Sequence, residues 1–141
     1  MTQAPARILG WQAADLAGDQ RWIFAANPRL AQATEAELQA WLAPVRQELK
    51  LGWGVAWIRG LGALPEAQLR RLYLAIGRGL GEPDTTYGEL YDVTDTGACH
   101  LQRAIPVSQT RAATTMHTDS SQRTTHPRWV GLACVSQAPE G

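Results

Sequence analysis

The stretch TEAELQAWLAPVRQELKLGWGVAWIRG, residues 34–60, decides the fold of this chain because it predicts a helix followed at once by a strand. Thr34 and Glu37 match the capping box, in which each side chain accepts a hydrogen bond from the backbone N–H of the other residue. The apolar residues that follow recur at the i, i+3, i+4 spacing of an amphipathic helix. They are Leu38, Trp41, Leu42, Val45 and Leu49.

This helix should end near Lys50 and Gly52. Pro44 lies inside it and predicts a kink, because proline cannot donate the backbone hydrogen bond of a regular helix. The run at residues 53–58 is short, β-prone and bounded by glycines, so it predicts a strand.

A second helix is expected to begin at Pro65, since proline is favoured in the first helical turn. Its apolar positions are Leu69, Leu72, Tyr73 and Ile76. A glycine-rich run follows and should terminate the helix by C-capping. It is not a dinucleotide-binding loop, because that fingerprint follows a strand and opens a helix. The glycines are Gly77, Gly79 and Gly81.

Farther along the chain, residues 90–93 and the apolar run at 129–135 predict two more strands. The fold class is therefore α+β. With 141 residues and neither an internal repeat nor a linker, we expect a single domain over residues 1–141.

The composition is that of a globular protein, with 45% hydrophobic and 18% charged residues. The 13 basic and 13 acidic residues are not segregated, which argues against a nucleic-acid partner. No apolar run approaches the roughly 20 residues of a membrane helix, and the first residues lack the apolar core of a secretory signal. We therefore expect a cytoplasmic protein that does not contact a membrane.

Cysteine and tryptophan usage points to structural roles. Cys99 and Cys134 match no zinc or redox spacing, so we expect buried or idle thiols. The tryptophans lie in apolar stretches, which predicts core packing in preference to a stacking surface. They are Trp11, Trp22, Trp41, Trp53, Trp57 and Trp129.

The triplet His117-Thr118-Asp119 carries the clearest chemical signal. Side chains at i and i+2 on a strand point to one face, so an imidazole and a carboxylate could reach one metal ion. These two groups are two thirds of the 2-His-1-carboxylate triad that holds non-heme Fe(II) in oxygenases. The alternative is a solvated histidine beside an aspartate that caps a turn.

Three ordered segments surround or contain this triplet. The first segment runs from GVAWIRGL, residues 54–61, to IGRGLGEP, residues 76–83. The second is the triplet itself. The third runs from PRWVGLACV, residues 127–135, to APEG, residues 138–141. In this order they resemble the N-terminal part of the TauD/TfdA (clavaminate synthase-like) family of Fe(II)/2-oxoglutarate-dependent dioxygenases. The resemblance runs from about residue 55 to residue 141.

The resemblance implies a hydroxylase-type oxidation of a small molecule that consumes 2-oxoglutarate and releases succinate and CO2. It assigns His117 and Asp119 as Fe(II) ligands. The second iron-binding histidine and the residues that bind 2-oxoglutarate, including an arginine, are expected beyond Gly141. Strand alternation from His117 also places Thr115 in the substrate pocket.

The fold implied by the resemblance is a partial double-stranded β-helix, or jelly roll, with flanking N-terminal helices and a barrel left incomplete in this chain. An open barrel exposes unpaired strand edges, so a second chain or self-association should complete it. Two other functions are compatible with the residues. One is a non-catalytic binding module on a partial oxygenase scaffold; the other is a zinc hydrolase using His117, Asp119 and His126. His100 is a further candidate ligand.

Overall fold

The computed structural model describes residues 10–97, 106–110 and 117–137. They divide into two units, which we describe separately. Among the described residues, one unit comprises residues 10–82 and 133–137, and the other comprises those that lie between residues 83 and 132. Among the described residues, no helix combines the length and apolar character that crossing a membrane requires.

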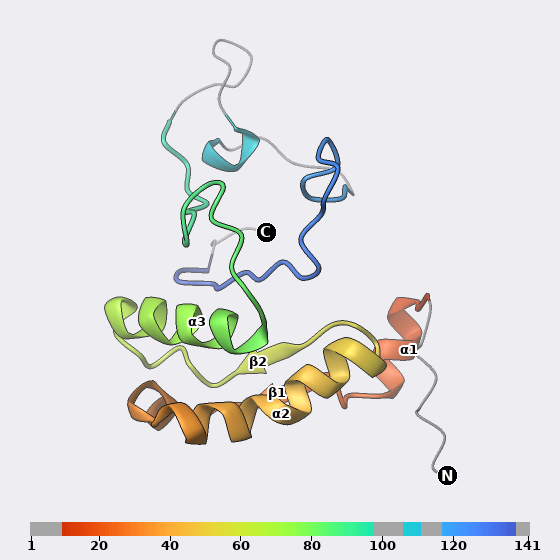
Figure 1. Ribbon diagram of the computed structural model, residues 1–141, viewed down its shortest axis with the longest axis vertical. Coiled ribbons are helices and arrows are strands. Elements are labelled where there is room, and N and C mark those ends of the chain that lie inside the picture. The colour runs from red at the N-terminus through yellow and green to blue at the C-terminus, as the bar shows by residue number, and fades with distance from the viewer. Residues whose placement is uncertain (1–9, 98–105, 111–116, 138–141) are drawn as a thin grey trace. The chain divides into compact units, whose positions relative to one another are not determined.

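The first unit contains all the α-helices and strands of the described chain (Figure 1). In chain order these are α1 (Ala13–Gly18), β1 (Ile23–Ala25), the 3-10 helix η1 (Pro28–Gln32), α2 (Glu35–Leu51), β2 (Trp57–Arg59) and α3 (Glu66–Leu80). β1 and β2 pair in parallel, with Phe24 opposite Ile58. The α+β class is therefore confirmed. The described sheet has two parallel strands, and the jelly roll remains a prediction.

α2 forms where the capping box and the apolar spacing predicted it. The Thr34 backbone N–H donates to Glu37 Oε2 at 2.7 Å, and the Glu37 N–H donates to Thr34 Oγ1 at 3.3 Å. The helix continues through Pro44 and ends at Gly52, whose N–H donates to the Glu48 carbonyl at 2.9 Å. Both predicted ends are confirmed.

Replacing Thr34 by Ala should lower the free energy of unfolding by about 1 kcal/mol, because the Glu37 N–H loses its side-chain acceptor. Urea denaturation followed by circular dichroism measures the change. Thr34→Ser keeps the hydroxyl and should unfold close to the parent. Equal midpoints for Thr34→Ala and the parent would show that the capping box does not stabilise α2.

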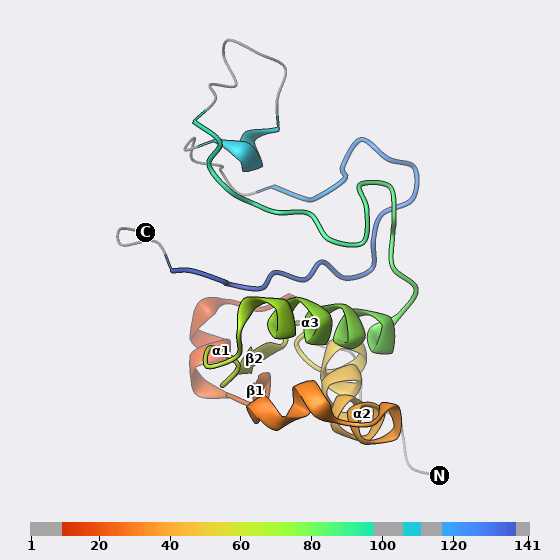
Figure 2. The same ribbon diagram turned by 90° about the vertical axis from the view of Figure 1, so that its left-hand side faces the viewer.

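α2 and α3 pack together through the main hydrophobic cluster, and Figure 2 gives a second view of both helices. Leu42 and Val45 are essentially inaccessible, at 0% and 1% exposure. Phe24 and Ile58 of the sheet pack against the same cluster, so the helices cover one face of the sheet. The buried members are Leu38, Leu42, Val45, Leu72 and Ile76.

The end of α3 corrects one prediction. The helix passes through Gly77 and Gly79 and stops at Gly81, whose N–H donates to the Gly77 carbonyl at 3.1 Å. Only Gly81 is therefore a C-cap. Gly79 has a packing reason instead, because a Cβ placed there would lie 2.4 Å from Leu42 Cδ1. Its missing side chain lets α3 approach α2 closely.

The strand predictions were only partly correct. β2 covers Trp57–Arg59 and is shorter than the predicted run at 53–58, because its ladder with β1 is three residues long. Residues 90–93 and 129–135 form no strand in the described chain, where no neighbouring backbone pairs with them. Leu132 is 86% exposed, so the apolar run at 129–135 is not buried in this structure.

The tryptophans also depart from the prediction. All six lie in described residues and none is fully buried; Trp41 does pack against the main cluster. Trp22 and Trp57 stack with their ring centroids 5.9 Å apart, and Trp57 is 49% exposed. The prediction of core packing is therefore wrong for Trp57. Cys134 is a free, exposed thiol, and Cys99 lies outside the described residues.

Candidate metal half-site

His117 and Asp119 lie in the second unit and bring an imidazole and a carboxylate together. His117 Nε2 is 3.2 Å from Asp119 Oδ1, and the two side chains are 57% and 52% exposed. The predicted strand is absent here, because His117 and Thr118 are irregular and Asp119 begins a turn. The two side chains approach each other without a strand, and their role as metal ligands stays a prediction.

The spacing of the two atoms fits a shared metal ion. Imidazole nitrogen and carboxylate oxygen bind metals at about 2.1 Å, so two adjacent ligands at a right angle stand about 3 Å apart. The observed 3.2 Å is close to that separation, and it is also the distance of a direct ion pair or hydrogen bond between the two groups. One nitrogen and one oxygen donor suit two positions of the facial triad of non-heme Fe(II), and their exposure leaves the remaining positions accessible.

No third ligand joins them among the described residues, where no group of three His, Cys, Asp or Glu side chains could hold a metal ion. His126 points its Nδ1 at the Ser120 carbonyl oxygen, 3.0 Å away. The ligand set of the zinc hydrolase hypothesis is therefore not assembled here. His100 and Thr115 lie outside the described residues, so their predicted roles stay predictions.

The turn after Asp119 is held by contacts that the sequence pattern did not reveal. Ser120 has a φ of 57°, in the left-handed region that non-glycine residues seldom adopt. Its carbonyl accepts a hydrogen bond from the Arg123 N–H at 2.9 Å and also faces His126 Nδ1. Together these contacts fix the backbone that follows the carboxylate.

Arg123 also forms an ion pair through Nη1 with Asp84 Oδ2, 39 residues earlier in the chain. Asp84 Oδ1 accepts hydrogen bonds from the Thr86 hydroxyl at 2.6 Å and from the Thr86 N–H at 3.0 Å. These bonds, with the Arg123 guanidinium, lower the pKa of Asp84 to about 2. Asp84 is therefore ionised at neutral and mildly acidic pH. Its polar loop offered no spacing signal that could have linked it to the triplet.

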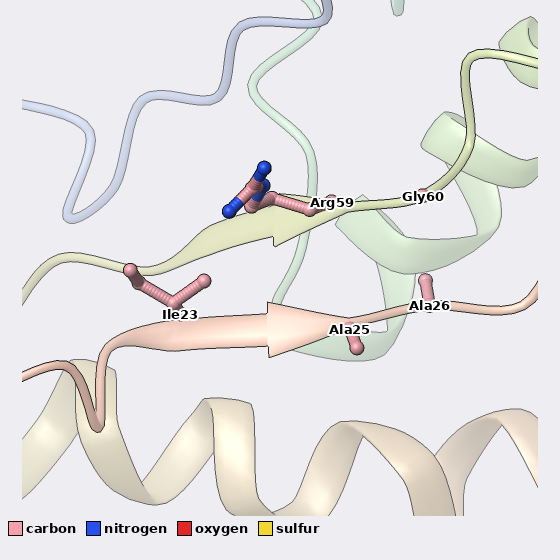
Figure 3. A pocket seen from close by; sticks show the side chains of 5 residues that line it. All are labelled: Ile23, Ala25, Ala26, Arg59 and Gly60. Atoms are coloured by element: carbon pink, nitrogen blue, oxygen red, sulfur yellow. The ribbon is translucent and has the colours of Figure 1, made fainter.

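The first unit contains a separate hollow of about 380 Å³ beside β1 and β2 (Figure 3). Arg59 is its only charged lining residue, and the Arg59 guanidinium lies 4.7 Å from the centre of the Trp57 ring. A single arginine engaged with an aromatic ring supplies neither a metal ligand nor a general base. The hollow is therefore not a candidate catalytic site. Its lining residues are Ile23, Ala25, Ala26, Arg59 and Gly60.

Comparison with known proteins identifies the family. Residues 12–141 match the family described as "Taurine catabolism dioxygenase TauD, TfdA family". The match covers α1, α2 and α3 of the first unit, which we call the helical unit, and also the His117-Thr118-Asp119 triplet. No curated protein and no solved structure matches the chain. The resemblance predicted for residues 55–141 is confirmed, and the match extends farther toward the N-terminus than predicted, to residue 12. The chain belongs to the TauD/TfdA family of dioxygenases.

Proposed function

We propose that this chain provides the iron-binding half-site of an Fe(II)/2-oxoglutarate-dependent oxygenase that hydroxylates a C–H bond of a small molecule. The observation that carries the proposal is the 3.2 Å approach of His117 Nε2 to Asp119 Oδ1 in a chain matched to a dioxygenase family. Fe(II) bound there would bring 2-oxoglutarate and O2 together, with succinate and CO2 as co-products.

The two residues have distinct tasks. Asp119 supplies a carboxylate oxygen and the negative charge that offsets part of the charge of Fe(II). His117 supplies Nε2 in the neutral imidazole form, so its proton must reside on Nδ1. A hydrogen-bond acceptor at Nδ1 would fix that tautomer and the ring orientation. Both groups are open to solvent, which gives a cosubstrate access to the metal.

The remaining parts of the site are proposed to come from another segment of polypeptide. A second histidine would complete the triad, and an arginine would pair with the far carboxylate of 2-oxoglutarate. That segment, either a continuation of the chain or a second polypeptide, would also pair with residues 129–135 and extend them into the jelly roll. The exposed Val130, Leu132 and Val135 side chains support such a partner, because burying them removes apolar surface from water.

Succinate formation tests this function. The full-length protein, alone and together with any companion chain, is incubated with Fe(II), 2-oxoglutarate and O2, and succinate is quantified. We expect succinate above background with the complete assembly. His117→Ala should reduce it to background, because one of the two ligands in this chain is lost.

The reference for this assay is the same mixture without Fe(II). Succinate at background in the complete assembly, with His117→Ala indistinguishable from the parent, would overturn the oxygenase proposal. The chain would then be a non-catalytic binding module on an oxygenase scaffold. Loss of succinate in His117→Ala with an unchanged melting temperature would assign the effect to the metal site.

A further inference from the structure

The Asp84–Arg123 ion pair connects two loops of the unit formed by residues 83–132. Asp84 follows the GEP segment at the end of α3, and Arg123 follows the triplet by four positions. The pair joins residues 39 positions apart, and both His117 and Asp119 lie between them in the sequence. It therefore constrains the chain on either side of the half-site.

Arg123 acts at two points at once. Its guanidinium holds Asp84, while its backbone N–H donates to the carbonyl of Ser120, the residue directly after Asp119. Ser120 has a left-handed backbone, which a non-glycine residue keeps only where neighbouring contacts impose it. The contact from Arg123 is one of those that hold the turn in this conformation.

Hydrogen bonds from Thr86 hold the Asp84 carboxylate in the orientation that pairs with the Arg123 guanidinium. Its Oδ1 is occupied by the hydroxyl and N–H of Thr86, which leaves Oδ2 directed at Arg123. The Asp84 and Arg123 side chains are 37% and 29% exposed, so the pair is partly shielded from solvent. A carboxylate already fixed by two hydrogen bonds loses less side-chain entropy on pairing than a free one.

We propose that Asp84 and Arg123 are positioning residues for the metal half-site, holding the turn that places the Asp119 carboxylate beside His117 Nε2. The inference rests on the proposed function, since it concerns the affinity of the same two ligands for Fe(II). Neither residue touches the metal. Their effect passes through Ser120 and is therefore smaller than that of a ligand.

The test measures Fe(II) affinity by anaerobic equilibrium dialysis of the full-length protein, together with any companion chain, without substrate. Arg123→Gln and Asp84→Asn should each weaken binding roughly threefold to tenfold, the range expected for a partly exposed ion pair acting on outer-shell geometry. The double variant should be no weaker than either single variant, because both substitutions remove the same interaction. Arg123→Lys retains the charge and should restore most of the affinity.

Arg128→Gln is the matched control, because Arg128 is an exposed arginine of the same segment whose guanidinium stacks on Trp129 at 4.9 Å. It should bind Fe(II) as the parent does. Melting temperatures of all variants are measured alongside. The positioning role is supported if Arg123→Gln and Asp84→Asn bind Fe(II) more weakly at an unchanged melting temperature while Arg123→Lys retains most of the affinity.

Three outcomes would overturn the inference in distinguishable ways. If His117→Ala abolishes Fe(II) binding while Arg123→Gln and Asp84→Asn stay within twofold of the parent, the half-site stands and the positioning role fails. If the effects of Arg123→Gln and Asp84→Asn add in full, the two residues act separately and the proposed link is wrong. If His117→Ala leaves Fe(II) binding unchanged, the proposed function fails and the inference fails with it.

Discussion

Asp119→Asn is expected to weaken Fe(II) binding by about 100-fold or more. The substitution keeps the shape of the side chain and removes its negative charge, and Fe(II) binds a neutral amide oxygen far less well than a carboxylate. Changes to residues that hydrogen-bond directly to a metal ligand already cost 10-fold to 100-fold, so loss of the ligand itself should exceed them. Anaerobic equilibrium dialysis measures the change.

Folding should be unaffected by the same substitution. Asp119 is 52% exposed, and exposed substitutions usually change the free energy of unfolding by less than about 0.5 kcal/mol. Ser121→Ala, two positions along the same turn, is the matched control and should retain both stability and metal binding. If Asp119→Asn bound Fe(II) like the parent, Asp119 would be the turn-capping aspartate of the alternative interpretation.

The helical unit could be predicted well from sequence because its signals are local. A capping box and a helical apolar spacing depend only on neighbouring residues, and both identified α2 nearly to the residue. The end of α3 was harder to predict, because the sequence does not show which of several closely spaced glycines ends the helix. Whether Gly79 caps or packs depends on Leu42, which is 37 positions away and enters the argument only in three dimensions.

The strands could be predicted less well because a strand depends on its partner. An apolar run such as 129–135 has the composition of a strand, yet no described backbone pairs with it. The candidate site shows the same limit. The i, i+2 spacing of His117 and Asp119 predicted that the two side chains approach each other. The Asp84–Arg123 pair depends on a loop closure that no short motif encodes.

Gly60→Ala is expected to lower the free energy of unfolding by about 3 kcal/mol or more. Gly60 has a φ of 98°, a conformation that costs an alanine about 1–2 kcal/mol. A Cβ there would also lie 2.3 Å from the Ala26 carbonyl oxygen, and an overlap of this kind forces backbone shifts that cost a further 1–3 kcal/mol or so. Urea denaturation followed by circular dichroism gives the change.

The backbone around Gly60 has little freedom to move away. The Ala26 N–H donates to the Arg59 carbonyl at 2.7 Å, immediately beyond the three-residue ladder of β1 and β2. Displacing the Ala26 carbonyl would strain this bond and the register of both strands. The substitution therefore acts on the sheet that packs against α2 and α3, and its effect should spread to the cooperative unfolding of the whole helical unit.

Gly62→Ala is the matched control, two positions farther along the same loop. A Cβ at Gly62 meets no atom within 4 Å, and its backbone lies outside the left-handed region. Alanine there should leave stability unchanged or raise it by up to about 1 kcal/mol, because it restricts only the unfolded chain. Equal losses for both variants would assign the effect to loop flexibility, whereas a loss confined to Gly60→Ala would locate it at the contact with Ala26.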